Sequence, residues 1–170
     1  SVMAISGAIA CSIVNGNILP GLHGNVAAAV VLSILAGTLC GFWNGFLVAK
    51  VKIQPIVATM ILLVGGRGIA QLITKGKIIT VNSDAYYFIN GGYILGLPFP
   101  LFIVIFLVGL LLLFVSRTSF GLSLESVGCN AKASKFAGIK VDRMLLAIYT
   151  ISGAFAAVAG LIESSGITGA

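Results

Sequence analysis

Residues 1–49 read SVMAISGAIACSIVNGNILPGLHGNVAAAVVLSILAGTLCGFWNGFLVA and contain no Asp, Glu, Lys or Arg. A globular domain in water needs charge on its outward faces, and roughly a quarter of its residues are charged. In this chain the charged share is only 8%, and the mean hydropathy is +1.16. Two more charge-free runs follow, at 85–116 and 144–162. Lipid is the solvent that tolerates this composition, so the sequence predicts an integral membrane protein.

The length of the apolar runs predicts membrane-spanning helices. A bilayer core about 30 Å thick requires roughly 20 apolar residues as helix. Backbone polar groups in hydrocarbon must be satisfied within a helix or a closed barrel, and continuous rather than alternating runs favour helices. We therefore predict an all-α fold, a polytopic transmembrane helical bundle forming a single domain over 1–170. About five spans are expected, at 1–14, 26–49, 55–74, 98–116 and 144–162.

Both ends of the chain lack the features of a natural terminus. Ser1 opens directly into an apolar run without an initiator Met or a signal peptide, and Ala170 follows a short polar stretch. We therefore expect an internal fragment of a longer protein, truncated at both ends, with a first span that is cut short.

Basic residues assign the orientation. The segment 117–143 carries five Lys and Arg residues against Glu125 and Asp142. Cytoplasmic loops are rich in Lys and Arg, so this segment is predicted to be cytoplasmic. Alternation then places 50–54 inside as well, and 15–25 and 75–96 outside, although 75–96 carries two lysines near its start. The net charge of +6 reflects this orientation rather than nucleic-acid binding.

The sequence contains no arrangement typical of an enzyme. Cys11, Cys40 and Cys129 are scattered, and no pair has the spacing of metal ligands. No phosphate-binding P-loop is present, so the chain is not expected to hydrolyse ATP by that chemistry. We predict no catalytic residue, no metal and no cofactor.

Arg67 is the strongest anomaly, because it lies near the middle of a predicted span within Gly65-Gly66-Arg67-Gly68. Arg at a span centre costs about 2.5–3.5 kcal/mol on insertion scales, so it usually faces a bundle interior or a wet cavity. Gln71 lies one helical turn further and shares its face. We take Arg67 and Gln71 as candidates for a translocation path. The alternative is a structural Arg that pairs with backbone carbonyls or snorkels outward.

Small residues at four-residue spacing predict close helix packing. Asn44, at the inner end of one such stripe, is a further candidate for the path. Trp43 is expected to anchor the helix at the membrane interface, with a pore wall as the alternative. The stripes comprise Gly37, Gly41 and Gly45 in the second span, and the pairs Gly153 with Ala157 and Ala156 with Gly160 in the last.

A short helix is predicted within the cytoplasmic segment. Asn130 is a good N-cap, and Gly138 stands where a helix often ends in a left-handed glycine. Between them, about two turns carry lysines on one face and apolar side chains on another. Such a helix either lies on the membrane or docks into a groove of a partner.

The same segment resembles the cytoplasmic signature of bacterial ABC sugar-importer permeases, a family that includes the ribose and galactose-type permeases. The family pattern is G-x-N-x-x-A-A-x-x-x-G-I, and Ser134 stands where the family usually has Ala. The residues that match the pattern are Gly128, Asn130, Ala133, Gly138 and Ile139.

Three further segments extend the resemblance over nearly the whole chain. The segment 54–59 (QPIVAT) is similar to the family's Q/N-P-F-I-A-T, and 96–100 (GLPFP) to its G-[IL]-P-x-P. The run 66–74 (GRGIAQLIT) is most similar to the galactofuranose-type members. We include Gln54 among the candidate path residues.

The resemblance implies a permease subunit that imports a monosaccharide across the bacterial inner membrane. Two permease subunits, identical or different, would form the pathway within the lipid bilayer, and a periplasmic sugar-binding protein would deliver the sugar. A cytoplasmic ATP-binding subunit would dock on the loop helix. The residues implied in that coupling are Gly128, Asn130, Ala133, Ser134, Phe136, Gly138 and Ile139.

Other functions remain open at this point. The same architecture could import another small solute, such as a branched-chain amino acid. A secondary transporter, a channel or a structural membrane subunit would need no ATPase. An ion-coupled transporter is expected to bury acidic residues in its spans, whereas Asp84, Glu125 and Asp142 are predicted in loops and only Glu163 near a span. The sequence therefore favours the ATP-driven permease.

Overall fold

The computed structural model describes residues 1–15, 26–76, 92–94 and 97–167. Most of the predicted outer segment 75–96 lies outside these residues. A pair of two-residue antiparallel strands precedes α5. The elements are α1 (Val2–Val14), α2 (Val26–Ala49), α3 (Pro55–Thr74), β1 (Tyr93–Ile94), β2 (Leu97–Pro98), α5 (Phe99–Arg117), α6 (Ser119–Cys129), α7 (Ala131–Phe136) and α8 (Val141–Ile167).

Four of the described helices, α2, α3, α5 and α8, are long and apolar enough to cross a membrane. Their bounds follow the predicted spans closely, except that α8 runs from Val141 to Ile167 rather than from 144 to 162, so Glu163 lies within it. The fifth apolar helix, α1, has 13 residues, about 20 Å at 1.5 Å per residue. Ser1, the residue before α1, lies against Gly66 near the middle of α3. Helix α1 is therefore long enough for only about two thirds of a hydrocarbon core about 30 Å thick.

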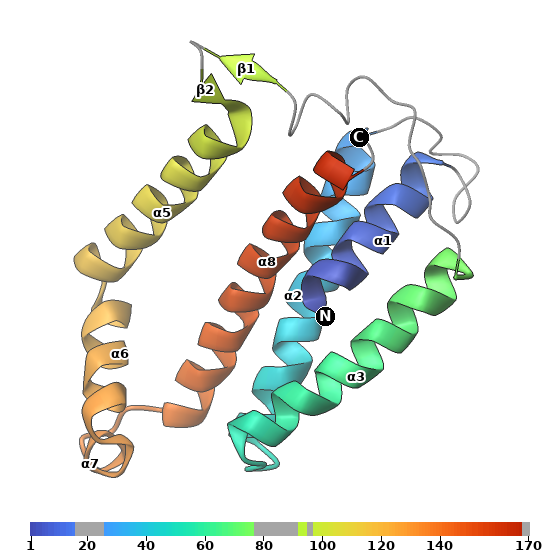
Figure 1. The fold of residues 1–170 in the computed structure, drawn as a ribbon. Helices are drawn as coiled ribbons and strands as arrows, with labels where there is room; N and C mark the ends of the chain where they lie inside the picture. The colour runs from blue at the N-terminus through green and yellow to red at the C-terminus, as the bar shows by residue number, and fades with distance from the viewer. Residues whose placement is uncertain (16–25, 77–91, 95–96, 168–170) are drawn as a thin grey trace.

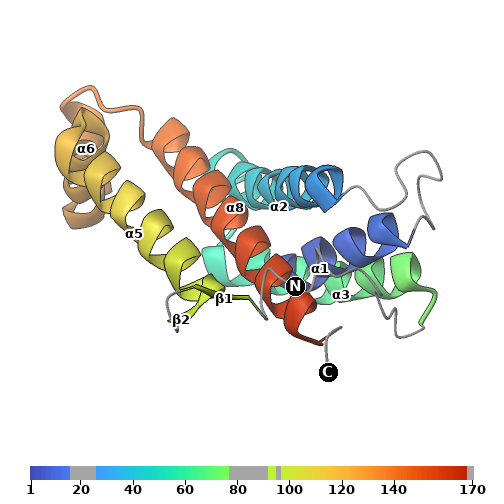
Figure 2. The ribbon, with the colours of Figure 1, turned by 90° about the horizontal axis from the view of Figure 1, so that it is seen from above.

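The pairing of α2 with α8 forms the centre of the bundle (Figures 1 and 2). A Cβ placed on Gly41 would lie 2.9 Å from the Cα of Gly153 and would also strike the carbonyl oxygen of Tyr149. A Cβ on Gly37 would strike the side chain of Ala157. The predicted close packing of these stripes is confirmed, because hydrogen in place of a side chain lets the two backbones touch.

Helices α1 and α3 lie around this central pair. Gly160 of α8 faces α1, since a Cβ there would lie 2.5 Å from the carbonyl oxygen of Met3. Gly66 of α3 also faces α1, since a Cβ there would lie 3.1 Å from Cδ1 of Ile5. The C-terminal half of α1, the start of α2 and the C-terminal part of α8 share an apolar core. Its residues are Ala10, Cys11, Ile13, Val14, Ala29 and Leu161.

Helices α5, α6 and α7 form an arm that stands away from the bundle (Figure 1). No residue of α5 is buried by the described part of the chain. An apolar hollow of about 340 Å³ separates α5 from Val158 of α8. An apolar helix exposed in this way is stable in lipid or against further helices, but not in water.

The segment 117–143 is more helical than the sequence predicts. Helix α6 occupies part of it, and Asp142 lies in the first turn of α8, so the prediction that Glu125 and Asp142 lie in loops is wrong. Phe120, Leu124 and Val127 recur at helical spacing and supply the apolar side of α6.

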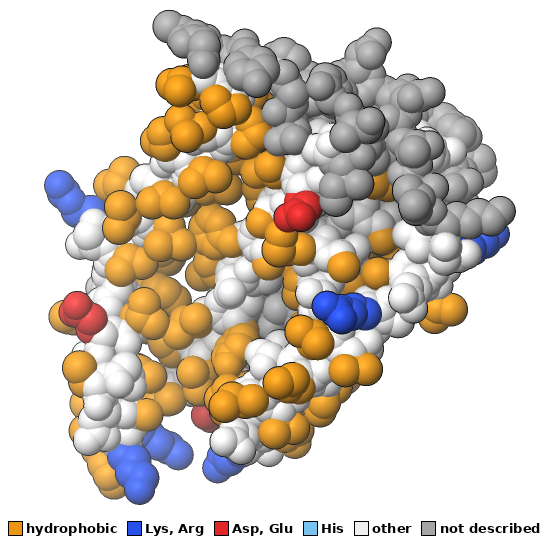
Figure 3. Space-filling model, viewed as in Figure 1, with side chains coloured by type: hydrophobic (Ala, Val, Ile, Leu, Met, Phe, Trp, Pro, Cys, Tyr) orange, Lys and Arg blue, Asp and Glu red, His pale blue; other side chains and the backbone are white. Residues whose placement is uncertain are grey.

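The two lysine-rich connections lie at the same end of the molecule, which we call the basic end. Lys50, directly after α2, lines one hollow together with Lys135, Lys140 and Arg143. Figure 3 shows Lys and Arg side chains gathered at the end where α7 lies, below a mainly apolar flank. This arrangement agrees with the alternation that placed 50–54 and 117–143 on one side of a membrane.

We predict that Gly41→Val destabilises the protein by about 1–3 kcal/mol, because the added methyl groups force α2 and α8 apart. Thermal unfolding of the full-length protein in detergent measures the loss. Gly109→Val is the matched control, because a Cβ on Gly109 meets no described atom within 4 Å. Equal melting temperatures for the two variants would contradict the packing argument.

Candidate functional site

Asn130 ends one helix and begins the next. Its backbone N–H donates to the carbonyl oxygen of Ser126 and closes α6. Its side-chain Oδ1 accepts hydrogen bonds from the backbone N–H groups of Lys132 and Ala133, both at 3.1 Å. The predicted N-cap is confirmed. It satisfies two N–H groups that the first turn of α7 would otherwise leave free.

Gly138 ends the same motif. Its φ of +88° lies in the region that favours glycine. The turn that it forms brings the N–H of Ile139 back to the carbonyl oxygen of Ser134 at 3.0 Å. The motif residues therefore fix the shape of a compact helix between α6 and α8.

The two faces of α7 differ. Ser134 is buried and its Oγ donates to the carbonyl oxygen of Asn130 at 2.9 Å, so this face is turned toward the molecule. Phe136 is 94% exposed, and Ala133 is exposed as well. A phenylalanine so exposed at a helix end is an apolar anchor that lacks a partner among the described residues.

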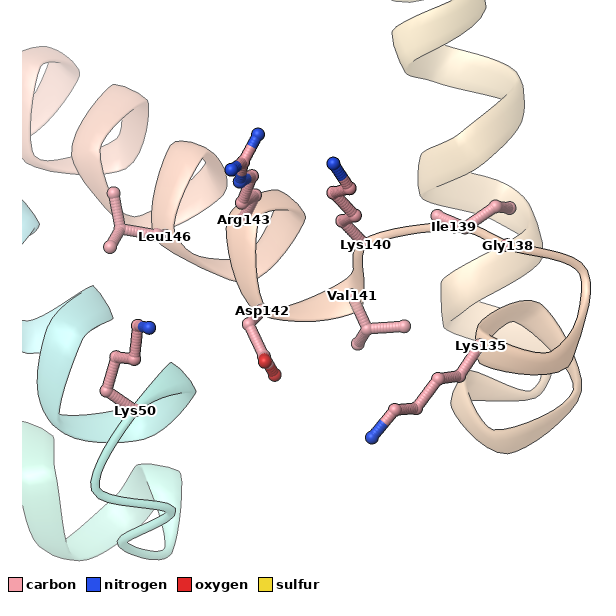
Figure 4. Close-up of a pocket in the computed structure, with 9 residues that line it drawn as sticks. All are labelled: Lys50, Lys135, Gly138, Ile139, Lys140, Val141, Asp142, Arg143 and Leu146. Carbon is pink, nitrogen blue, oxygen red and sulfur yellow. The ribbon is translucent and has the colours of Figure 1, made fainter.

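A hollow of about 400 Å³ lies at the basic end, between the end of α2, helix α7 and the start of α8. Figure 4 shows Asp142 and Lys135 projecting on one side of the connection from α7 to α8, and Lys140 and Arg143 on the other. Lys50 stands across from them at the end of α2. The remaining lining residues are Gly138, Ile139, Val141 and Leu146.

Asn44 is buried within α2, with only 6% of its surface exposed. Its Oδ1 has no hydrogen-bond partner among the described residues. Together with Trp43, it lines a groove of about 390 Å³ between α2 and α3, opposite Gly65 and Gly66. Trp43 is 58% exposed and also borders the groove. Its position therefore fits both predicted roles, an anchor at the membrane interface and a wall of a path.

The other three candidate path residues are exposed on α3 or directly before it, and they do not meet at one point. Arg67 and Gln71 lie in the second half of the helix. Gln54 precedes its first residue at the basic end, about 25 Å from Gln71 at 1.5 Å per residue. The described structure thus brings none of these three into the groove beside Asn44.

No metal site is evident in the described ranges, where no three His, Cys, Asp or Glu residues cluster in a way that could hold an ion. The features that stand out are therefore a capped helix with an exposed phenylalanine, a cationic hollow beside it, and apolar helices of membrane-spanning length. The apolar helices are features of a membrane protein, and the exposed phenylalanine and the cationic hollow lie at its basic end.

Comparison with known families identifies the type of membrane protein. Residues 1–170 match the family described as Branched-chain amino acid transport system / permease component. The chain belongs to this permease family. It is accordingly a multi-pass membrane protein, as its four long apolar helices also indicate.

Several curated proteins that are similar to this chain in sequence are named as sugar permeases. The galactofuranose transporter permease protein YtfT of Escherichia coli (strain K12) is 44% identical over 100% of this chain and 48% of its own length. The fructose import permease protein FruF of Bifidobacterium longum is 34% identical over 98% of this chain and 46% of its own length.

The ribose import permease protein RbsC of Haemophilus influenzae is 33% identical over 100% of this chain and 52% of its own length. The chain thus spans about half the length of the curated relatives it matches. No solved structure matches the chain. The predicted resemblance to the sugar-importer permeases is confirmed by the relatives, whereas the roles of individual residues are not tested by them.

Proposed function

We propose that this chain forms part of the permease subunit of an ATP-binding-cassette importer that moves a monosaccharide across the bacterial inner membrane. The observation that carries the proposal is the whole-chain similarity to permeases named for galactofuranose, fructose and ribose. The description of the family names branched-chain amino acids, which keeps an amino acid as the second candidate. The sugar names of the relatives favour the first.

ATP hydrolysis in this proposal takes place on a separate cytoplasmic subunit that docks on α7. The exposed Phe136 and Ala133 form the contact surface, while Asn130 and Gly138 hold the helix in shape. Gly128, Ser134 and Ile139 support that shape from the flanks and from the buried side. A second permease subunit and a periplasmic sugar-binding protein complete the assembly.

The polar residues of α2 and α3 are the proposed lining of the sugar path. Arg67 and Gln71 are exposed on the described chain, and an Arg exposed to hydrocarbon near mid-span is costly. We infer that protein or water, rather than lipid, covers this face in the complete permease. Asn44 and Gln54 extend the polar lining toward the basic end.

Labelling of a native thiol tests the orientation. Cys129 is exposed at the end of α6, whereas Cys11 is buried and Cys40 only partly exposed. We expect an impermeant maleimide to label Cys129 of the full-length protein in inside-out vesicles and not in intact spheroplasts. Cys129→Ser should remove that signal. Labelling of Cys129 in intact spheroplasts would reverse the proposed topology.

Removal of the exposed phenylalanine tests the docking surface. A central aromatic anchor contributes about 2 kcal/mol or more to an interface, so Phe136→Ala should weaken binding of the ATP-binding subunit roughly thirtyfold. Co-purification and titration with that subunit measure the effect. Phe106→Ala is the control, because Phe106 is also exposed, but within α5. Unchanged binding by the Phe136 variant would rule out α7 as the contact.

Substitution of Arg67 tests the path. Arg67→Leu should reduce sugar uptake roughly tenfold to a hundredfold, which corresponds to the loss of one hydrogen bond to a charged group, about 1.5–3 kcal/mol. Arg67→Lys keeps the charge without the planar fork and should retain part of the uptake. Membrane levels of both variants are measured in parallel. Wild-type uptake by a normally inserted Leu variant would show that Arg67 lies outside the path.

A further inference from the structure

Cationic side chains border the hollow at the basic end, with Lys135 on one side of the connection from α7 to α8 and Lys140 and Arg143 on the other (Figure 4). Four cationic side chains line it, and Asp142 is the single carboxylate among them. Within the described part of the chain, no ion pair neutralises any of the four. These cations are Lys50 after α2, Lys135 of α7, Lys140 of the connection and Arg143 of α8. The fold thus brings Lys50 beside a group of three cations at 135–143, far along the sequence.

The depth of the hollow in the membrane is set by the helices that border it. Lys50 follows the last residue of the apolar helix α2, and Arg143 lies in the first turn of α8. The hollow therefore lies at the level where an apolar helix surface meets water, which is the level of lipid headgroups. Its wall also contains apolar side chains, from Ile139, Val141 and Leu146. A hollow lined by both cationic and apolar side chains suits an amphiphile, which has a charged group and apolar chains, better than a fully soluble anion.

We infer that this hollow binds the phosphate group of an anionic phospholipid. Basic pockets between transmembrane helices on the cytoplasmic side are suited to such headgroups. The volume of about 400 Å³ admits a phosphate with its glycerol. The acyl chains of the lipid would extend from the apolar wall into the bilayer. This inference requires only that the chain is embedded in a membrane, and it does not rest on the proposed transport function.

The alternative occupant is an acidic segment of a protein partner, and the geometry of α7 disfavours it. The side chain of α7 that lines the hollow is Lys135, whereas its most exposed side chain is Phe136. A partner seated on Phe136 would therefore meet a different face of α7. The lipid would hold the inner face of this short helix against the ends of α2 and α8.

The test measures, by native mass spectrometry, the binding of phosphatidylglycerol and of phosphatidylcholine to the full-length protein in detergent. We expect phosphatidylglycerol to bind more strongly, and the double variant Lys50→Gln/Lys135→Gln to lose that preference. Each lysine removed should weaken binding about fivefold, the factor that corresponds to about 1 kcal/mol per basic residue near an anionic membrane surface. Lys50→Arg/Lys135→Arg should keep the preference, because it keeps both charges.

A matched control lies in the same two connections. Lys52 and Lys132 are exposed but do not line the hollow. The variant Lys52→Gln/Lys132→Gln removes the same charge at the same end of the molecule, and it should bind phosphatidylglycerol as the parent protein does. An equal loss in both double variants would show a diffuse surface effect and overturn the site.

A gain-of-binding variant keeps the inference testable if the double variant fails to fold. Asp142→Asn removes the one carboxylate from the hollow and should strengthen phosphatidylglycerol binding. Unchanged or weaker binding would contradict the inference.

Inorganic phosphate is the competitor that distinguishes the two sources of the anion, a lipid headgroup and a free phosphate. Displacement of the lipid by equimolar inorganic phosphate would show a site for a free anion, and equal binding of phosphatidylcholine would show no anion site at all.

Discussion

Backbone contact between α2 and α8 is the interaction that positions the other helices. In hydrocarbon the hydrophobic effect does not press helices together, so van der Waals contact between closely approaching backbones provides the attraction. Gly41 and Gly153 permit that approach, and a Cβ on either residue would overlap the other helix. Helix α1 then packs on this pair at Gly160, and α3 packs on α1 at Gly66. Close backbone contact at glycine positions, rather than packing of large apolar side chains, therefore holds α2 and α8 together.

The arm of α5, α6 and α7 is attached to the bundle at few points. Its last residues connect through Gly138 to the start of α8, which is the helix paired with α2. The connection 137–140 is therefore the shortest route along the chain from α7 to the helix pair α2 and α8.

Hydropathy predicted the spans well, because the hydrocarbon thickness fixes the length of an apolar helix. The N-cap at Asn130 and the glycine turn at Gly138 were also predictable, since each depends on local backbone geometry. Helix α6 was not predicted, because its apolar residues lie among Ser and Gly and its periodicity is brief. The cationic hollow was not predictable from spacing, because Lys50 meets Lys135 only through the packing of α2 with α8. The path residues of α3 remain predictions, since their exposed face has no neighbour in the described chain.

The pairing of α2 with α8 also determines when the bundle can form during synthesis of the chain. The two helices are separated by more than ninety residues of chain, from Ala49 to Val141. At about 5–20 residues per second, the end of α8 leaves the ribosome roughly 6–24 s after the end of α2. Until then the glycine stripe of α2 has no complementary surface to meet. The bundle therefore closes only when its last described helix has been synthesised, and a nascent chain halted before that point holds α2 without its partner.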